Sequence, residues 1–153
     1  MKSGAMSWRM AHALGGTPQD GLLGEINASA PNRNRASDGG IGDARHSAQS
    51  SDHNPCACCG IVCARDFTHD PHGGLNGHQL AAWLEDRARA GDTRIKYVIW
   101  NKRIMSGPGQ THPCGVWRTY RGKNPHTKHV HLSVTHDQCD DTAPWGWPPQ
   151  EET

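Results

Sequence analysis

The chain has 153 residues and a mass of 16.7 kDa, which is enough for one compact domain and too little for two. Its 16 Lys and Arg balance 15 Asp and Glu without long blocks of either sign, so a nucleic-acid partner bound through charge is not indicated. No apolar run approaches the roughly 18 residues that span a bilayer, and residues 1–10 lack a secretory signal, so we expect a soluble protein without a membrane partner.

The composition predicts a small sheet surrounded by turns. Only 34% of the residues are hydrophobic, and the chain contains 18 Gly and 10 Pro. We interpret residues 1–6 as a vector-derived leader and 7–139 as the domain. Residues 140–153 form either a linker or a terminal segment that packs Trp145 and Trp147 onto the domain.

The N-terminal half predicts helical turns, a loop and a strand. Weak helical patterning over 7–30 is broken by the Gly and Pro residues of 15–18, and the polar stretch 31–55 is unusually long for a loop. The β-rich run 60–68 follows, as a strand that places Ala64, Asp66 and Thr68 on one face. Cys63 and Phe67 fall on the other face.

The C-terminal half predicts one helix and three strands. Asn76 is the expected N-cap of a helix that ends before Gly91 and carries Leu80, Trp83, Leu84 and Ala88 on one stripe. Strand 96–100 turns at 101–102 into 103–105, and 129–134 is the last strand. The expected fold is α+β: a small, mostly antiparallel sheet with flanking helices and many loops.

Three side chains stand out as a candidate metal site. In the last strand, alternation places Val130 and Leu132 in the core and puts His129 and His131 about 7 Å apart on the opposite face. Asp66 is a carboxylate in the middle of a strong strand, where a charge needs a partner or a metal.

His53 lies at the end of the polar loop, just before the strand of Asp66. Together, His53, Asp66 and His131 supply two imidazoles and a carboxylate, which is a catalytic zinc set that keeps a fourth position for water. We therefore expect one catalytic Zn²⁺.

The motifs that contain these residues resemble a known enzyme family. Ser51-x-His53, Ala64-x-Asp66 and His129-x-His131 are similar to the signature of the zinc D-alanyl-D-alanine carboxypeptidases and L-alanyl-D-glutamate endopeptidases. Segments 51–55, 66–71, 96–100 and 124–131 resemble the peptidase domain of actinobacteriophage endolysins. The similarity covers roughly residues 7–134, with a longer interval between His53 and Asp66 than the simplest family members have.

The resemblance implies roles for several residues. His53, Asp66 and His131 would bind zinc, and His129 would act as general base, because no Glu lies between Glu85 and Glu151. Arg33 would hold the substrate carbonyl, with Arg35 and Gln49 as rivals, and Ser51 would lie at the substrate.

The resemblance also implies a partner and a place of action. The substrate would be the stem peptide of peptidoglycan, cut by a monomer. The protein would be made in the cytoplasm of a bacterial host and would act on the cell wall after release.

Six cysteines leave three alternatives open. A second, structural zinc, one or more disulfides, and plain buried thiols all fit their spacing. The cysteines are Cys56, Cys58, Cys59, Cys63, Cys114 and Cys139.

Two other functions compete with the peptidase. The run Asp52-His53 with Pro55, near Cys56-x-x-Cys59, also resembles metal-dependent His-Asn-His nucleases, although that reading leaves the paired histidines unexplained. A non-catalytic, zinc-stapled module that binds the cell wall is the second alternative.

Overall fold

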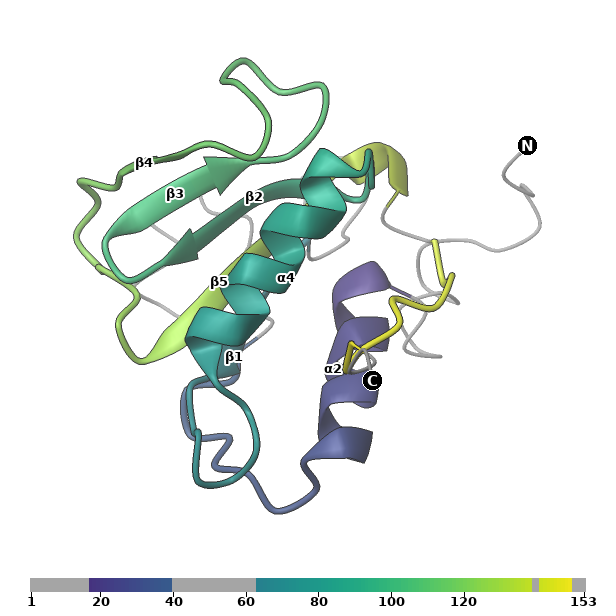
Figure 1. Cartoon of the computed structure of the whole chain (residues 1–153), viewed down its shortest axis with the longest axis vertical. Helices are drawn as coiled ribbons and strands as arrows, with labels where there is room; N and C mark the ends of the chain where they lie inside the picture. The colour runs from purple at the N-terminus through teal and green to yellow at the C-terminus, as the bar shows by residue number, and fades with distance from the viewer. Residues whose placement is uncertain (1–16, 40–62, 139–140, 150–153) are drawn as a thin grey trace.

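The computed structural model describes residues 17–39, 63–138 and 141–149, which form one antiparallel sheet with helices on one side (Figure 1). The strand order is β1-β5-β2-β3-β4, and every neighbouring pair is antiparallel. The expected α+β class is confirmed. The elements are α2 (Pro18–Ser29), β1 (Ala64–Thr68), α4 (Gly77–Arg89), β2 (Ile95–Trp100), β3 (Arg103–Ser106), β4 (Trp117–Thr119), β5 (His129–Val134) and the 3-10 turn η1 (His136–Gln138).

Both helices begin at a capping side chain, and the Asn76 cap is the one that the sequence predicts. Pro18 is the first residue of α2, and the Thr17 side chain accepts a hydrogen bond from the backbone N–H of Asp20. The Asn76 side chain caps α4 by accepting from the N–H of His78 and Gln79. The expected helical turns before residue 17 lie outside the described residues.

The core lies between the helices and one face of the sheet. α4 packs on β2 and β5, and α2 packs on β1 and β5. Each central strand contributes alternate residues to this layer, because side chains on a strand alternate between the two faces. Its fully buried members include Leu22, Ile26, Phe67, Leu80, Leu84, Val98, Val130, Leu132 and Val134.

The connection between β2 and β3 shows how local chemistry sets the register. Asn101 and Lys102 both have positive φ, 51° and 67°, which matches a two-residue turn between antiparallel strands and confirms the expected hairpin of β2 and β3. The sequence did not predict β4, since three residues are too few to show a period.

The segment 33–39 lines the outer edge of β1. The N–H of Asp66 donates to the carbonyl of Gly39 at 2.8 Å, and the Asp38 carboxylate accepts from the N–H and hydroxyl of Thr68, both at 2.7 Å. This part of the expected loop over 31–55 is therefore fastened to the sheet beside Asp66.

The segment 141–149 packs onto the helices. Trp145 is 1% exposed; its indole N–H donates to the carbonyl of Pro18, and its backbone N–H donates to Glu25. Of the two alternatives for the tail, packing onto the domain is the one that these residues adopt.

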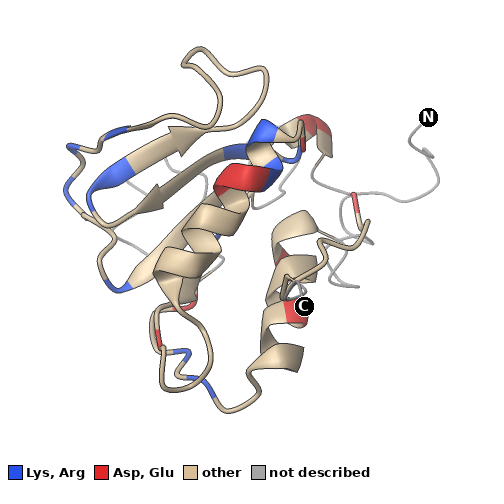
Figure 2. Cartoon of the chain, in the orientation of Figure 1, with Lys and Arg blue, Asp and Glu red and all other residues tan. Residues whose placement is uncertain are grey.

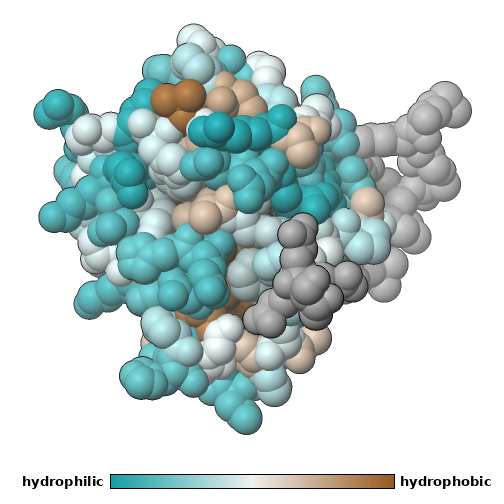
Figure 3. Space-filling view, viewed as in Figure 1, coloured by the Kyte–Doolittle hydropathy of each residue, from teal (hydrophilic) through white to brown (hydrophobic). Residues whose placement is uncertain are grey.

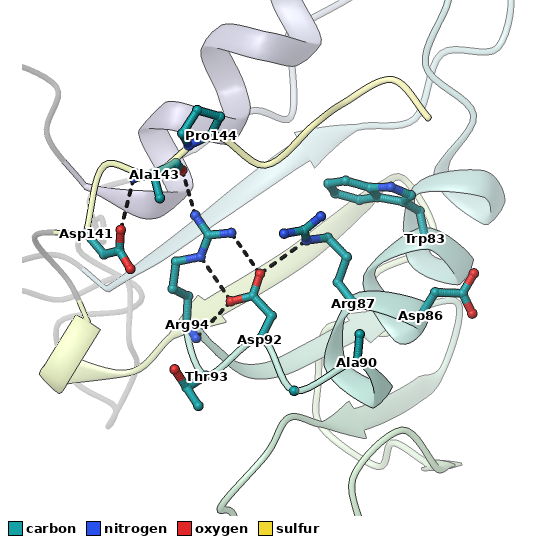
Figure 4. A pocket seen from close by; sticks show the side chains of 11 residues that line it. Trp83, Asp86, Arg87, Ala90, Asp92, Thr93, Arg94, Asp141, Ala143 and Pro144 are labelled. Atoms are coloured by element: carbon teal, nitrogen blue, oxygen red, sulfur yellow. Dashed lines mark hydrogen bonds and ion pairs between the residues drawn. The ribbon is translucent and has the colours of Figure 1, made fainter. Parts of the chain in front are cut away.

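A buried ion network also fastens this segment (Figure 4). Arg94 donates to both carboxylate oxygens of Asp92 and to the carbonyl of Ala143, and its guanidinium lies 3.8 Å from the centre of the Trp145 ring. Arg87 donates to the same carboxylate at 3.1 Å. Arg87, Asp92, Arg94 and Ala143 line a hollow of about 540 Å³ on the helical side of the molecule.

The helical side of the surface is mainly polar, with small apolar patches (Figure 3). Among the described residues, Val116 is the large hydrophobic side chain that stands exposed. No helix in the described segments combines the length and apolar character that crossing a lipid bilayer requires.

Candidate metal centre

One carboxylate and three imidazoles meet on the face of the sheet opposite the helices. Asp66 on β1 is paired in register with His131 on β5, and Thr68 with His129, so both histidines share the face of Asp66. His131 Nδ1 lies 3.0 Å from Asp66 Oδ1, and His129 Nε2 lies 3.4 Å from Asp66 Oδ2. His126, from the loop before β5, packs its ring against both histidines, with centroids 4.9 and 5.3 Å away.

The backbone fixes the orientation of His126. Its Nδ1 lies 2.7 Å from the carbonyl oxygen of Asn124, which can only accept, so Nδ1 carries the proton and Nε2 keeps a lone pair. Burial, followed by the charges of His131 and His129, lowers the pKa of His126 to about 4. The ring is therefore neutral at pH 7, the form in which a histidine binds a metal.

His131 is held on three sides. Its Nδ1 faces Asp66, its Nε2 lies 2.7 Å from the hydroxyl oxygen of Ser133, and its ring stacks on Tyr97 at 5.4 Å. With 4% of the residue exposed, the ring is locked in place. A ligand needs this kind of support from its surroundings if it is to keep a metal site in shape.

The donor set fits a zinc ion. Ligand atoms of Asp66, His126 and His129 all lie within 4.8 Å of one another. Two ligands on a tetrahedral zinc with bonds of 2.0–2.1 Å are about 3.3 Å apart. The separations of 3.0 and 3.4 Å from Asp66 to His131 and His129 are close to that value. Imidazole nitrogens and carboxylate oxygens are also common ligands of zinc.

The structure brings together three of the residues that the sequence singled out, Asp66, His129 and His131. His53, Ser51 and Gln49 lie outside the described residues. Sequence reasoning missed His126 because a loop residue has no periodicity to mark it. The one available signal was its place three residues before His129, within a segment that resembles the endolysin motif.

Comparison with known proteins adds one finding. A family model described as VldE, C-terminal domain, matches residues 26–131, more than half of the chain. The chain belongs to this family. The matched span of the VldE C-terminal domain runs from α2 to His131 and includes all four clustered side chains, Asp66, His126, His129 and His131. No curated protein and no solved structure matches the chain.

Arg33 has a structural environment within this VldE C-terminal domain. Its side chain is fully buried, and its hydrogen bonds go to Asn27, the carbonyl of Asn34 and the Asp38 carboxylate. Since Asp38 in turn binds Thr68, Arg33 fastens the segment 33–39 to β1. Arg35 donates to the carbonyl of Pro31. Neither guanidinium makes a hydrogen bond to the clustered histidines or to Asp66 among the described residues.

The described cysteines lie apart from the cluster. Cys63 is buried in the core just before β1, and its carbonyl accepts from the N–H of Val134. Cys114 has a free, exposed thiol that donates to the carbonyl of Ala88 at 3.2 Å. Cys56, Cys58, Cys59 and Cys139 lie outside the described residues, so a second zinc or a disulfide stays a prediction.

Charge is distributed unevenly around the site, despite the overall balance. Between Asp92 and Asp137 the sequence contains eight Lys and Arg and no acidic residue. This stretch includes β2, β3, β4 and β5, so basic residues gather along the β2–β3 hairpin, the loop after β4 and the start of β5 (Figure 2). Arg94 is neutralised by Asp92, but the stretch as a whole carries an excess of positive charge.

Proposed function

We propose that this chain is a zinc-dependent peptidase that hydrolyses a peptide bond in the stem peptide or cross-link of peptidoglycan. The observation that carries the proposal is the meeting of Asp66 with His126, His129 and His131 on one face of the sheet. The resemblance of the Ser-x-His, Asp and His-x-His motifs to zinc peptidoglycan peptidases supports the substrate class.

Two ligand sets share Asp66. The motifs favour His53, Asp66 and His131, whereas geometry alone groups Asp66 with His126 and His129. We propose the first set, because His131 has the ring nitrogen nearer to Asp66, at 3.0 against 3.4 Å, and is the more rigidly held. The second set is the alternative, and metal counting on single variants separates the two.

When bound, zinc would supply a Lewis acid that polarises the scissile carbonyl and lowers the pKa of a water molecule. In the proposed reaction His129 accepts a proton at Nε2 from the attacking water and returns it to the leaving nitrogen. Asp66 Oδ2, 3.4 Å away, would stabilise the protonated ring. His126 limits where the His129 ring can lie, since the two rings meet edge to face at 4.9 Å.

Purified cell walls test the proposed function directly. We expect the protein to release free amines from them, a chelator to abolish the release, and added Zn²⁺ to restore it. Mass spectrometry of the digested muropeptides would then identify the bond that is cut. Intact walls after incubation with the zinc-loaded protein would reject the peptidase and favour the non-catalytic module.

The basic side of the sheet gives the nuclease alternative one supporting observation, because a polyanion would also fit it. A plasmid nicking assay distinguishes the two functions. Nicking by the wild type that disappears in Asp66→Ala would favour the nuclease. Its absence, together with amine release from cell walls, would favour the peptidase.

A further inference from the structure

A single row of paired residues crosses the whole sheet from the metal cluster. Asp66 pairs with His131, His131 with Ile99, Ile99 with Ile104, and Ile104 with Arg118. Directly paired residues of antiparallel strands point to the same face. Arg118 on β4 therefore lies on the face of the cluster, at the opposite end of the row.

Arg118 carries a charge that no acidic side chain of the described segments offsets. Its one polar contact is a hydrogen bond of 3.3 Å from Nη1 to the hydroxyl of Ser106, and no carboxylate in the described residues pairs with it. The buried or partly buried arginines Arg33, Arg87 and Arg94 contrast with this, since each is bound to an aspartate. A half-exposed guanidinium of this kind is suited to an external carboxylate or phosphate.

The floor between the cluster and Arg118 is apolar. Ile99 and Ile104 occupy the two positions between His131 and Arg118; Ile99 is buried and Ile104 is half-buried. Three strand spacings of about 4.8 Å put His131 and Arg118 about 14 Å apart, which an extended peptide covers in about four residues. Because the Arg118 side chain is long, the distance that the bound peptide must span is shorter still.

We propose that Arg118 binds a carboxylate of the peptide substrate, a few residues from the scissile bond, while the intervening chain lies along the cluster face of the sheet and passes the half-buried Ile104. This inference rests on the proposed function, and it deepens it by naming the substrate as an acidic peptide. Stem peptides carry such groups, as the free α-carboxylate of D-Glu and the free carboxylate of diaminopimelate. Arg118 then acts as a specificity-determining residue.

Matched peptides test the inference. Zinc-loaded wild type and Arg118→Gln would be compared on a synthetic stem peptide with free carboxylates and on versions with each carboxylate converted to the amide. We expect Arg118→Gln to raise KM about tenfold to a hundredfold for the carboxylate peptide, the worth of a charged hydrogen bond. For one of the amidated peptides, the two proteins should have the same KM.

Arg103 provides the control for a general loss of charge. It lies on the neighbouring strand but is paired with Thr119, on the other face, where its guanidinium lies 5.9 Å from the Trp117 ring. Arg103→Gln should leave the preference for the carboxylate peptide intact. Arg118→Lys, which keeps the charge but not the fork of donors, should recover part of the affinity.

The possible outcomes test the assignment of Arg118 and the proposed peptidase function separately. If the wild type cleaves the peptides but Arg118→Gln changes the KM of all of them equally, or of none, the assignment of Arg118 is wrong. If the zinc-loaded wild type cleaves no peptide, the peptidase proposal fails. Titration of the uncleaved peptides, followed by NMR, then decides whether Arg118 still selects the carboxylate form.

Discussion

His131 and Asp66 face each other across β5 and β1, with Nδ1 and Oδ1 3.0 Å apart. Their backbones are paired in register, so the separation is set by the sheet and not by a flexible loop. The sheet also fixes which face they share, the one away from α2 and α4. A metal bound here would have at least two ligands on rigid elements, as an accurately shaped site requires.

Removing the charge of Asp66 tests the metal centre, because both proposed ligand sets include this residue. Asp66→Asn keeps the size of the side chain but removes the anion that both ligand sets need. We expect bound zinc to fall by about one ion per chain, with peptidase activity lost alongside it. Elemental analysis after gel filtration measures the metal. Asp86→Asn, an exposed carboxylate on α4, should keep full zinc and activity.

Single histidine variants separate the two ligand sets. If His53, Asp66 and His131 bind the ion, His131→Ala loses both metal and activity, while His129→Ala keeps the metal and loses about a hundredfold or more in kcat. Retention of zinc by His131→Ala and its loss from His126→Ala would favour the second ligand set, Asp66 with His126 and His129. A normal kcat in His129→Ala would exclude this residue as the base.

Trp145 should be a major contributor to stability. The side chain is 1% exposed, donates to the carbonyl of Pro18 and lies under the Arg94 guanidinium. We expect Trp145→Ala to lower the free energy of unfolding by about 3–5 kcal/mol in urea titrations. Val116→Ala, at a site that is 47% exposed, should change it by no more than about 0.5 kcal/mol. Equal effects would mean that 141–149 contributes little to the packing.

The lowered pKa of Asp92 predicts how the stability of the protein depends on pH. Burial acts to raise the pKa of Asp92, but the hydrogen bonds and charge of Arg94, with a further bond from Arg87, outweigh it and lower the pKa below its usual range. The carboxylate therefore contributes stability above its unfolded pKa of about 3.9, and this stability is lost as pH falls through the lower folded pKa.

The matched variant for this prediction is Asp92→Asn. It should be less stable than wild type by about 1–3 kcal/mol at pH 7. Its unfolding free energy should also fall less steeply than that of wild type below about pH 4. Thermal unfolding between pH 2.5 and 7 measures both effects. Parallel curves for the two proteins would show that Asp92 titrates normally.

The parts that sequence predicted well are those in which one local rule dominates. The Asn76 cap and the apolar stripe with Leu80 and Leu84 define α4, and strict alternation defines β5 and the shared face of His129 and His131. The hairpin follows in the same way from the residues at 101–102.

The parts that sequence did not predict depend on tertiary contacts. β4 is three residues long and exists because Ile104 and Met105 of β3 offer it partners. His126 joins the cluster through a bond to the Asn124 carbonyl, which no pattern of side chains reveals. Arg33 suited an oxyanion role by position alone, and only the folded chain places Asp38 and Asn27 against it.

The division of the sheet into two faces has a practical consequence. Because the histidines lie on one side and the helices with residues 141–149 on the other, a fluorophore or a surface tether attached at Asp86 would stay clear of the metal centre. Immobilised in this way, the protein would present Asp66 and the neighbouring strands to a cell-wall fragment in solution.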